Sequence, residues 1–320
     1  MKKSVLKAVL TLLLSSTASA ETVYVTLEKD NALAVIDPIA GVLVKTVPIG
    51  QRPRGIALGQ DNKFLYVATS DDNTIKIIDA DTLSETARLP SGEDPETFAL
   101  NPDNTRLFVS NEDDSLVTVI DVATRQAIKQ IPVGVEPEGI AVSPDNHWLI
   151  STSETTNMVH WIDTKSLTIT DNTLVDPRPR AATFSADSKQ LWVTSEMAGT
   201  LTVLDTDTRQ IIKKIQFKVP GVTADTIQPV GVVIDKDRRW GYVALGPANR
   251  VAVVDAQTFA IEKYLLVGQR VWNLAFSPDQ QRLYTTNGLS SDISIIDLNS
   301  HKVTRSIAVG RNPWGVVARP

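Results

Sequence analysis

The chain has 320 residues, a formal net charge of -5 at pH 7 and no cysteine. The absence of cysteine excludes disulfides, thiolate metal sites, thiol catalysis and covalent haem attachment through a C-x-x-C-H motif. The acidic balance argues against general nucleic-acid binding, which requires a basic surface.

Residues 1–20 predict a secretory signal peptide that is cleaved after Ala20. Lys2 and Lys3 form a basic start, residues 8–14 are apolar, and Ala18-Ser19-Ala20 is a small-residue cleavage site. A membrane anchor is the less favoured reading, because the apolar run is shorter than the roughly 20 residues that span a bilayer. We therefore expect a periplasmic protein with no membrane span after cleavage, in which residues 21–320 form one domain.

Variants of the segment Val-Ile-Asp recur along the rest of the chain. The repeat aspartates are Asp37, Asp79, Asp121, Asp163, Asp205, Asp255 and Asp297. The steps between them are 42, 42, 42, 42, 50 and 42 residues. A repeat of this length with strand-like content is typical of a β-propeller with one blade per repeat.

Residues 55–92 illustrate the strands expected in each repeat. Four short segments rich in branched and aromatic residues are separated by turn residues, as in one propeller blade. The expected strands are 55–58, 64–69, 74–78 and 86–90. Because a catalytic residue is rarely needed in every repeat, we expect each repeat aspartate to accept hydrogen bonds from the backbone of the turn that follows it.

One repeat is longer than the others. A proline-type position follows each repeat aspartate by 16 residues, except that Pro229 follows Asp205 by 24 residues. The extra residues fall within 217–226, in the loop before the first strand of a blade. The sequence does not decide between a lid over a binding face and an inert loop.

The two ends of the chain complete the ring. Residues 315–318 have the pattern of a first strand with no blade after it, and residues 22–26 that of a second strand with no first strand before it. Pairing of these strands leaves no open edge between blades. We therefore predict an all-β fold, a seven-bladed β-propeller of four-stranded antiparallel blades, closed by N- and C-terminal strands in one blade.

The second strand of several repeats carries a common motif. It reads Tyr24-Val25-Thr26, Phe108-Val109-Ser110-Asn111, Trp192-Val193-Thr194-Ser195 and Tyr284-Thr285-Thr286-Asn287. These segments resemble the YVTN-type β-propeller repeat, and the resemblance covers the whole chain after the leader. It implies the propeller fold and is weak evidence for any particular function.

A narrower resemblance lies mainly in the loops that join successive repeats. The segments are 50–55 (GQRPRG), 133–139 (VGVEPEG), 244–250 (ALGPANR) and 312–315 (NPWG). They are similar to segments of β-propeller proteins associated with PQQ-dependent alcohol catabolism and its transport genes. This resemblance implies a non-catalytic accessory or binding role without a cofactor, and a PQQ-dependent dehydrogenase or an ABC transporter component as partner. It assigns no site residues.

Loops on one face of the predicted propeller bring charged residues close to the ring axis. Strand direction alternates within a blade, so the residues that flank each proline-type position lie together on this face. The candidate binding residues are Arg52, Arg54, Glu96, Glu138, Arg178, Arg180, Arg270, Trp272, Arg311 and Trp314. Guanidinium groups bind carboxylates through paired hydrogen bonds, and indoles supply stacking area. We interpret the arc from Arg270 through Trp314 to Arg54 as a site for a planar anionic ligand or an acidic loop of a protein partner.

A structural alternative uses the same residues. Arg54 can pair with Glu96, and Arg180 with Glu138, so that these charges merely close the mouth of the ring. The sequence alone leaves both interpretations open.

A second set of acids shares one repeat position in the loop between the second and third strands. Its members are Glu28, Glu112, Glu154 and Glu196. Several converging carboxylates would suit Ca²⁺. Equivalent positions in different blades are well separated unless they lie near the axis, so we instead expect acids that are solvated or bonded to Ser or Thr, and no metal.

The sequence favours a periplasmic propeller that binds a ligand or partner without catalysis. One alternative is a propeller-type lactonase, which needs a metal and an acid–base pair at the central channel and would have to use Glu28, Glu96 and Glu138. A second alternative is single-stranded DNA binding, which needs a basic groove with stacking aromatics and would have only the arc of Trp272 and Trp314. No nucleophile motif supports a hydrolytic triad.

Overall fold

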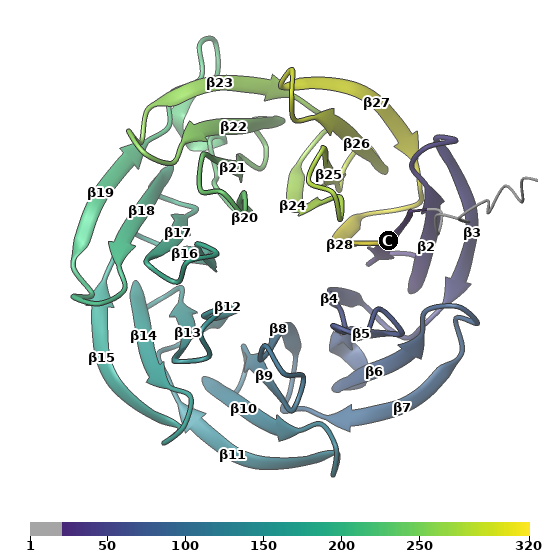
Figure 1. Ribbon diagram of the computed structural model, residues 1–320, viewed down its shortest axis with the longest axis vertical. Helices are drawn as coiled ribbons and strands as arrows, with labels where there is room; N and C mark the ends of the chain where they lie inside the picture. The colour runs from purple at the N-terminus through teal and green to yellow at the C-terminus, as the bar shows by residue number, and fades with distance from the viewer. Residues whose placement is uncertain (1–20) are drawn as a thin grey trace, which may run out of the picture.

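Seven four-stranded antiparallel sheets surround a central axis in the computed structural model, which describes residues 21–320 (Figure 1). The predicted seven-bladed propeller is therefore confirmed. The predicted signal peptide lies outside the described residues. Within residues 21–320, no helix has the length and apolar character required to cross a membrane.

The first four blades are listed from the axis outward (Figure 1). Blade A contains β28 (Pro313–Arg319), β1 (Thr22–Leu27), β2 (Ala32–Asp37) and β3 (Val42–Pro48). Blade B contains β4 (Pro53–Leu58), β5 (Phe64–Thr69), β6 (Thr74–Asp79) and β7 (Glu85–Pro90). Blade C contains β8 (Pro95–Leu100), β9 (Arg106–Asn111), β10 (Leu116–Asp121) and β11 (Gln126–Pro132). Blade D contains β12 (Pro137–Val142), β13 (Trp148–Ser153), β14 (Met158–Asp163) and β15 (Thr168–Leu174).

The remaining blades follow the same order. Blade E contains β16 (Pro179–Phe184), β17 (Gln190–Ser195), β18 (Thr200–Asp205) and β19 (Ile211–Gln216). Blade F contains β20 (Val232–Ile234), β21 (Trp240–Ala244), β22 (Arg250–Asp255) and β23 (Ile261–Leu266). Blade G contains β24 (Val271–Phe276), β25 (Arg282–Asn287), β26 (Asp292–Asp297) and β27 (Lys302–Ala308). Two short 3-10 helices, η1 (Ser70–Asp72) and η2 (Ala224–Thr226), lie in loops.

The N- and C-terminal strands share blade A, as the sequence predicts. Strand β28 pairs with β1 in antiparallel register, with Val316 opposite Val25 and Val317 opposite Tyr24. Glu21, directly before β1, accepts a hydrogen bond from the hydroxyl of Tyr284 in blade G at 2.5 Å. The closing blade is therefore tied both within its own sheet and to its neighbour.

Apolar packing between neighbouring blades forms the core. The second and third strands are buried along most of their length, because each blade is covered by a blade on either side. Among the described residues, buried side chains form seven clusters, and each spans one junction between blades. At the junction of blades A and B, for example, Tyr24 and Leu33 pack with Leu65, Val67 and Ile78.

Threonine hydroxyls tie the inner strands of adjacent blades together near the axis. Thr26 Oγ1 accepts a hydrogen bond from Gly315 N at 2.8 Å and donates one to Arg54 O of the next blade, also at 2.8 Å. Thr194 and Thr286 make the same pair of contacts in blades E and G. Each hydroxyl thus satisfies backbone groups at the bulge that interrupts the inner pair of strands.

The inner strands approach one another too closely for side chains at some positions. A Cβ atom at Gly231 would lie 2.6 Å from the carbonyl oxygen of Trp272, and one at Gly315 would lie 2.5 Å from that of Arg54. Glycine is therefore required where the backbone of the next blade is this near. Arg54 and Glu138 directly precede the equivalent glycines Gly55 and Gly139, so their charged side chains lie together near one end of the axis.

The repeat aspartates have the expected structural role. Asp37 Oδ1 accepts hydrogen bonds from Ile39 N at 2.9 Å and Ala40 N at 2.8 Å. The other six aspartates accept equivalent bonds in their own turns. The prediction that these carboxylates shape the turn between the third and fourth strands is confirmed.

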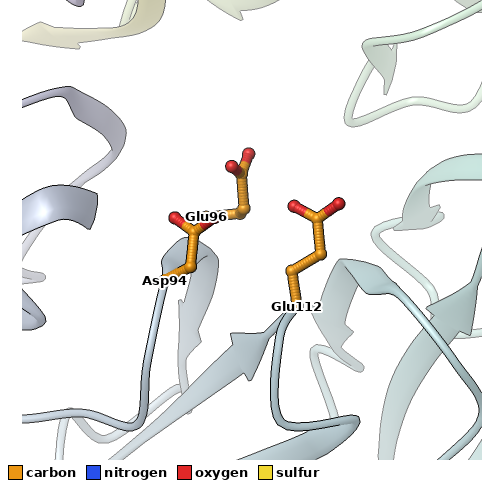
Figure 2. Close-up of side chains that lie close together, drawn as sticks. All are labelled: Asp94, Glu96 and Glu112. Atoms are coloured by element: carbon orange, nitrogen blue, oxygen red, sulfur yellow. The ribbon is translucent and has the colours of Figure 1, made fainter.

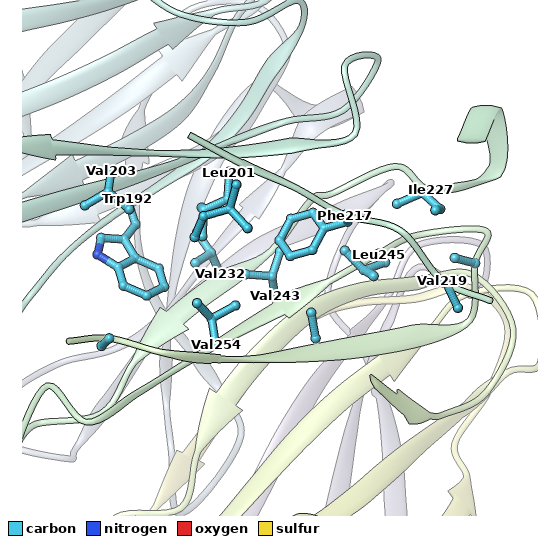
Figure 3. Packing of buried hydrophobic residues seen from close by; sticks show 14 residues of the cluster. Trp192, Leu201, Val203, Phe217, Val219, Ile227, Val232, Val243, Leu245 and Val254 are labelled. Carbon is cyan, nitrogen blue, oxygen red and sulfur yellow. The ribbon is translucent and has the colours of Figure 1, made fainter. Parts of the chain in front are cut away.

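The insertion at 217–226 packs between two blades. Phe217 and Val219 are buried and belong to the apolar cluster that contains Trp192 and Leu201 of blade E and Val243 of blade F (Figure 3). The backbone N–H of Lys218 donates to the hydroxyl of Tyr264 on the outer strand β23 at 3.1 Å. The insertion is therefore anchored at the junction of blades E and F, where it extends the apolar core.

Replacing Phe217 by Ala is expected to lower the free energy of unfolding by about 3–5 kcal/mol, because it leaves a cavity in a buried apolar cluster. Denaturant unfolding measures this loss. Ile212→Ala is the matched control, because Ile212 is 44% exposed on the adjacent strand β19. An equal effect of the two substitutions would show that the insertion does not contribute to the core.

Candidate functional site

The ring mouth contains a cavity of about 590 Å³ on the axis. Its walls are formed by the loops that join successive blades and the loops between second and third strands. The lining residues are Arg52, Arg54, Glu96, Glu112, Glu138, Arg178, Arg180, Glu196, Met197, Gln228, Arg270 and Trp272. Eight of the ten predicted binding residues therefore line this cavity, and Arg311 and Trp314 do not.

A recurring backbone conformation positions the outer charges of the mouth. Arg52, Arg178 and Arg270 directly precede the proline-type position and have φ values of 48°, 62° and 53°. This left-handed conformation is unfavourable for residues other than glycine. An asparagine in the neighbouring loop stabilises this conformation. For example, the backbone N–H of Arg270 donates to Asn249 Oδ1 at 2.8 Å. The backbone conformation therefore fixes the direction in which each arginine side chain leaves the chain.

One ion-pair cluster joins blades A, B and C. Arg52 lies 2.8 Å from an oxygen of Asp94 and 2.6 Å from an oxygen of Glu96. Arg54 contacts the second oxygen of Glu96 and lies 3.4 Å from Glu28. Glu96 is completely buried, so these two guanidinium groups supply the charge that its carboxylate requires.

A second ion-pair cluster joins blades D and E. Arg180 lies 2.5 Å from Glu138 and 2.7 Å from Glu154. Arg178 lies 2.7 Å from the other oxygen of Glu154 and 3.2 Å from Glu196. Both ion pairs of the structural alternative, between Arg54 and Glu96 and between Arg180 and Glu138, are thus present.

The expectation that the loop acids are solvated or bonded to Ser or Thr is wrong for Glu28, Glu154 and Glu196. All three are buried and lie within ion-pair distance of arginines. The physical reason is the closeness of the two kinds of loop at the axis, which sequence spacing alone does not reveal. The fourth member, Glu112, differs because no hydrogen bond or ion pair connects its carboxylate to another described residue.

Glu138 holds its proton unusually tightly. Burial raises the pKa of its carboxyl, Arg180 lowers it and the neighbouring Glu154 raises it, and the net result is a pKa of about 8. Burial alone would lower the pKa of Arg180, but the surrounding carboxylates, including Glu196, raise it instead. These directions agree with the composition of the second cluster, in which three carboxyl groups lie beside two guanidinium groups.

Arg270 is the least paired arginine of the cavity. Its guanidinium carbon lies 4.4 Å from the centre of the Trp272 ring, a cation–π contact. The nearest carboxylate oxygen, that of Glu196, lies 3.8 Å from the guanidinium. The one hydrogen bond that the guanidinium makes to another described residue goes to the side chain of Gln228 at 3.5 Å. Burial lowers the pKa of Arg270. This guanidinium retains donors for an anion.

Arg311 and Trp314 lie apart from the cavity. The Arg311 guanidinium lies 2.5 Å from Asp30 and is 73% exposed. Trp314 is buried and lines a narrower space of about 170 Å³ that also contacts Trp272. The arc expected from sequence is therefore split, and Arg270 with Trp272 is the part that faces the cavity.

Three carboxylates in blade C lie close together. The oxygens of Asp94, Glu96 and Glu112 come within 4.8 Å of one another, and their side chains extend toward the open mouth (Figure 2). Ca²⁺ requires six to eight oxygen ligands. Arg52 and Arg54 already neutralise two of these carboxylates, and their positive charges oppose a divalent cation. The donor set therefore does not suit Ca²⁺.

The family and structural comparisons agree with this fold. Residues 64–161 match the model of the YNCE-like beta-propeller family. This match runs from β5 in blade B to β14 in blade D and supports the YVTN-type repeat. No curated protein sequence is significantly similar to the chain.

Several solved structures share the architecture. Hydrazine synthase from Kuenenia stuttgartiensis has a TM-score of 0.79 at 16% identity, over 86% of this chain and 92% of that chain. A candidate 6-phosphogluconolactonase from Bacteroides fragilis has a TM-score of 0.80 at 16% identity, over 95% and 99%. The dihydro-heme d1 dehydrogenase NirN has a TM-score of 0.69 at 14% identity, over 92% and 74%. At these identities the similarity shows the fold alone.

Glu138 is expected to give the protein a distinctive pH dependence of stability. Its pKa is raised from 4.5 to about 8 on folding. Between these values the folded chain binds one more proton than the unfolded chain, so the free energy of unfolding falls as pH rises and levels off above about 8. Glu138→Gln is neutral at every pH and removes this fall. Denaturant unfolding across this pH range measures the fall, and the same pH dependence in both proteins would contradict the raised pKa of Glu138.

Proposed function

We propose that this protein is a non-catalytic binding propeller whose ring mouth takes up an anionic ligand or an anionic loop of a protein partner. The observation that carries the proposal is the stacked pair of Arg270 and Trp272. Its guanidinium faces a cavity of about 590 Å³, and its nearest carboxylate oxygen, that of Glu196, lies 3.8 Å away. The volume lies within the usual range for small-molecule sites.

Exposed apolar side chains on the same face support a protein partner as well. Met197 is 75% exposed, Leu289 is 68% exposed and Val135 is 48% exposed. These residues lie in the mouth-facing loops of blades E and G and in the loop between blades C and D. Apolar contacts around a charged recognition point are typical of a protein interface.

The mouth geometry favours binding over lactone hydrolysis. The carboxylates that a metal-dependent lactonase would use, Glu28, Glu96 and Glu138, are each engaged by an arginine. Single-stranded DNA binding is also less favoured, because Trp314 is buried and offers no face to a base. Neither alternative has a set of free groups comparable to Arg270 and Trp272.

The cellular setting of this proposal comes from the sequence. The leader supports export to the periplasm, and the loop segments that resemble proteins of PQQ-dependent alcohol catabolism support a dehydrogenase or transporter component as partner. Co-purification with the tagged chain from alcohol-grown cells, identified by mass spectrometry, tests this setting. Enrichment of neither class of partner, compared with Arg270→Ala protein, would contradict it.

Arg270→Ala and Trp272→Ala are each expected to weaken the binding of planar carboxylates at least about ten-fold, because each removes a charge-assisted or stacking contact. Calorimetry with benzoate and pyridine dicarboxylate measures the change. Arg311→Ala is the matched control and is expected to leave affinity unchanged, since Arg311 pairs with Asp30 outside the cavity. Equal affinities for wild type, Arg270→Ala and Trp272→Ala would refute the proposed site.

A further inference from the structure

Two incompletely paired groups of opposite charge face each other across the mouth. Arg270 and Gln228 lie where blades F and G meet, whereas Glu112 belongs to blade C. Blade C lies across the ring opening from blades F and G (Figure 1). All three residues line the same cavity. The space between them therefore has a positive wall and a negative wall.

Glu112 is chemically suited to receive a cation. Its side chain is half-buried and points toward the open mouth (Figure 2). Burial raises the pKa of its carboxyl, and the charges of Asp94 and Glu154 raise it further. A partly desolvated carboxylate without a partner is unfavourable. A cationic group placed beside Glu112 would offset both the cost of desolvation and the repulsion from Asp94 and Glu154.

Neither a simple anion nor a metal ion would pair with both Arg270 and Glu112. The cavity lining carries five arginines and four glutamates, and most of them already neutralise one another. An anion at Arg270 leaves Glu112 unpaired. A divalent cation at Glu112 meets the guanidinium groups of Arg52 and Arg54, which lie on the adjacent carboxylates.

We propose that the mouth binds a dipolar ligand of the amino acid class, with its carboxylate at Arg270 and its ammonium group at Glu112. This inference rests on the proposed binding function and specifies its ligand. Gln228 supplies a further amide beside the carboxylate, and the face of Trp272 covers the apolar stem of the ligand. The free N-terminus and an acidic side chain of a peptide would present the same two charges.

Calorimetry with matched probes tests the inference. ω-Amino acids from glycine to aminooctanoate are compared with the carboxylate and the amine of the same chain length. At least one amino acid is expected to bind about ten-fold more tightly than its matched carboxylate, because it gains a charge-assisted contact. Glu112→Gln is expected to remove this preference and leave the affinity for the carboxylate unchanged.

Two further variants are compared with wild type in the same calorimetric series. Glu93→Gln removes an exposed acid from the mouth loop before β8, so it is expected to keep the preference for the amino acid. Arg270→Gln is expected to weaken the carboxylate and the amino acid alike.

The outcomes separate the two proposals. If carboxylates bind as tightly as amino acids throughout the series, the dipolar ligand is refuted and the Arg270 site stands. Retention of the preference by Glu112→Gln protein also refutes the inference. If Ca²⁺ alone binds wild type and not Glu112→Gln, Glu112 belongs to a metal site instead. If neither carboxylates nor amino acids bind wild type, the inference and the proposed function both fail.

Discussion

The close approach of the inner strands at the axis is the constraint on which the rest of the structure depends. Where backbones meet within van der Waals distance, the chain uses glycine, as at Gly231 and Gly315. Threonine hydroxyls such as that of Thr26 bond across the same gap. Arg54 and Glu138, which precede the equivalent glycines Gly55 and Gly139, are consequently crowded into one mouth. Because crowding removes water, a buried charged side chain there requires a partner.

The ion pairs of the mouth follow from this constraint and have a structural role. Arg54 in blade B holds buried carboxyl groups of blades A and C, and Arg180 in blade E holds two buried carboxyl groups of blade D. A charged group of the mouth that departs from this pattern is available for a ligand. Arg270 and Glu112 are such departures, because Arg270 has only a distant carboxylate and no ion pair connects Glu112 to another described residue.

The sequence predicted the architecture well because each feature depends on local spacing. The repeat aspartates fixed the number of blades, and the chain ends predicted the pairing of β1 with β28. The site was predicted less completely, because it depends on contacts between blades. The burial of Trp314 and the pairing of Arg311 with Asp30 cannot be read from spacing. One signal was available: the loop acids of blades A and D face arginines of the next blade, whereas the blade after Glu112 carries Glu136 and Glu138.

The central claim is that the closely paired arginines of the mouth support the fold, whereas the weakly paired Arg270 is available for binding. The most direct measurement is the free energy of unfolding of Arg180→Gln and Arg270→Gln at neutral pH. Loss of Arg180 leaves the buried Glu138 without an arginine and removes one of the two arginines that hold Glu154, so it is expected to cost about 3–5 kcal/mol. Loss of Arg270 is expected to change stability by less than about 1 kcal/mol, since it has only distant partners. Equal losses of stability would contradict the claim.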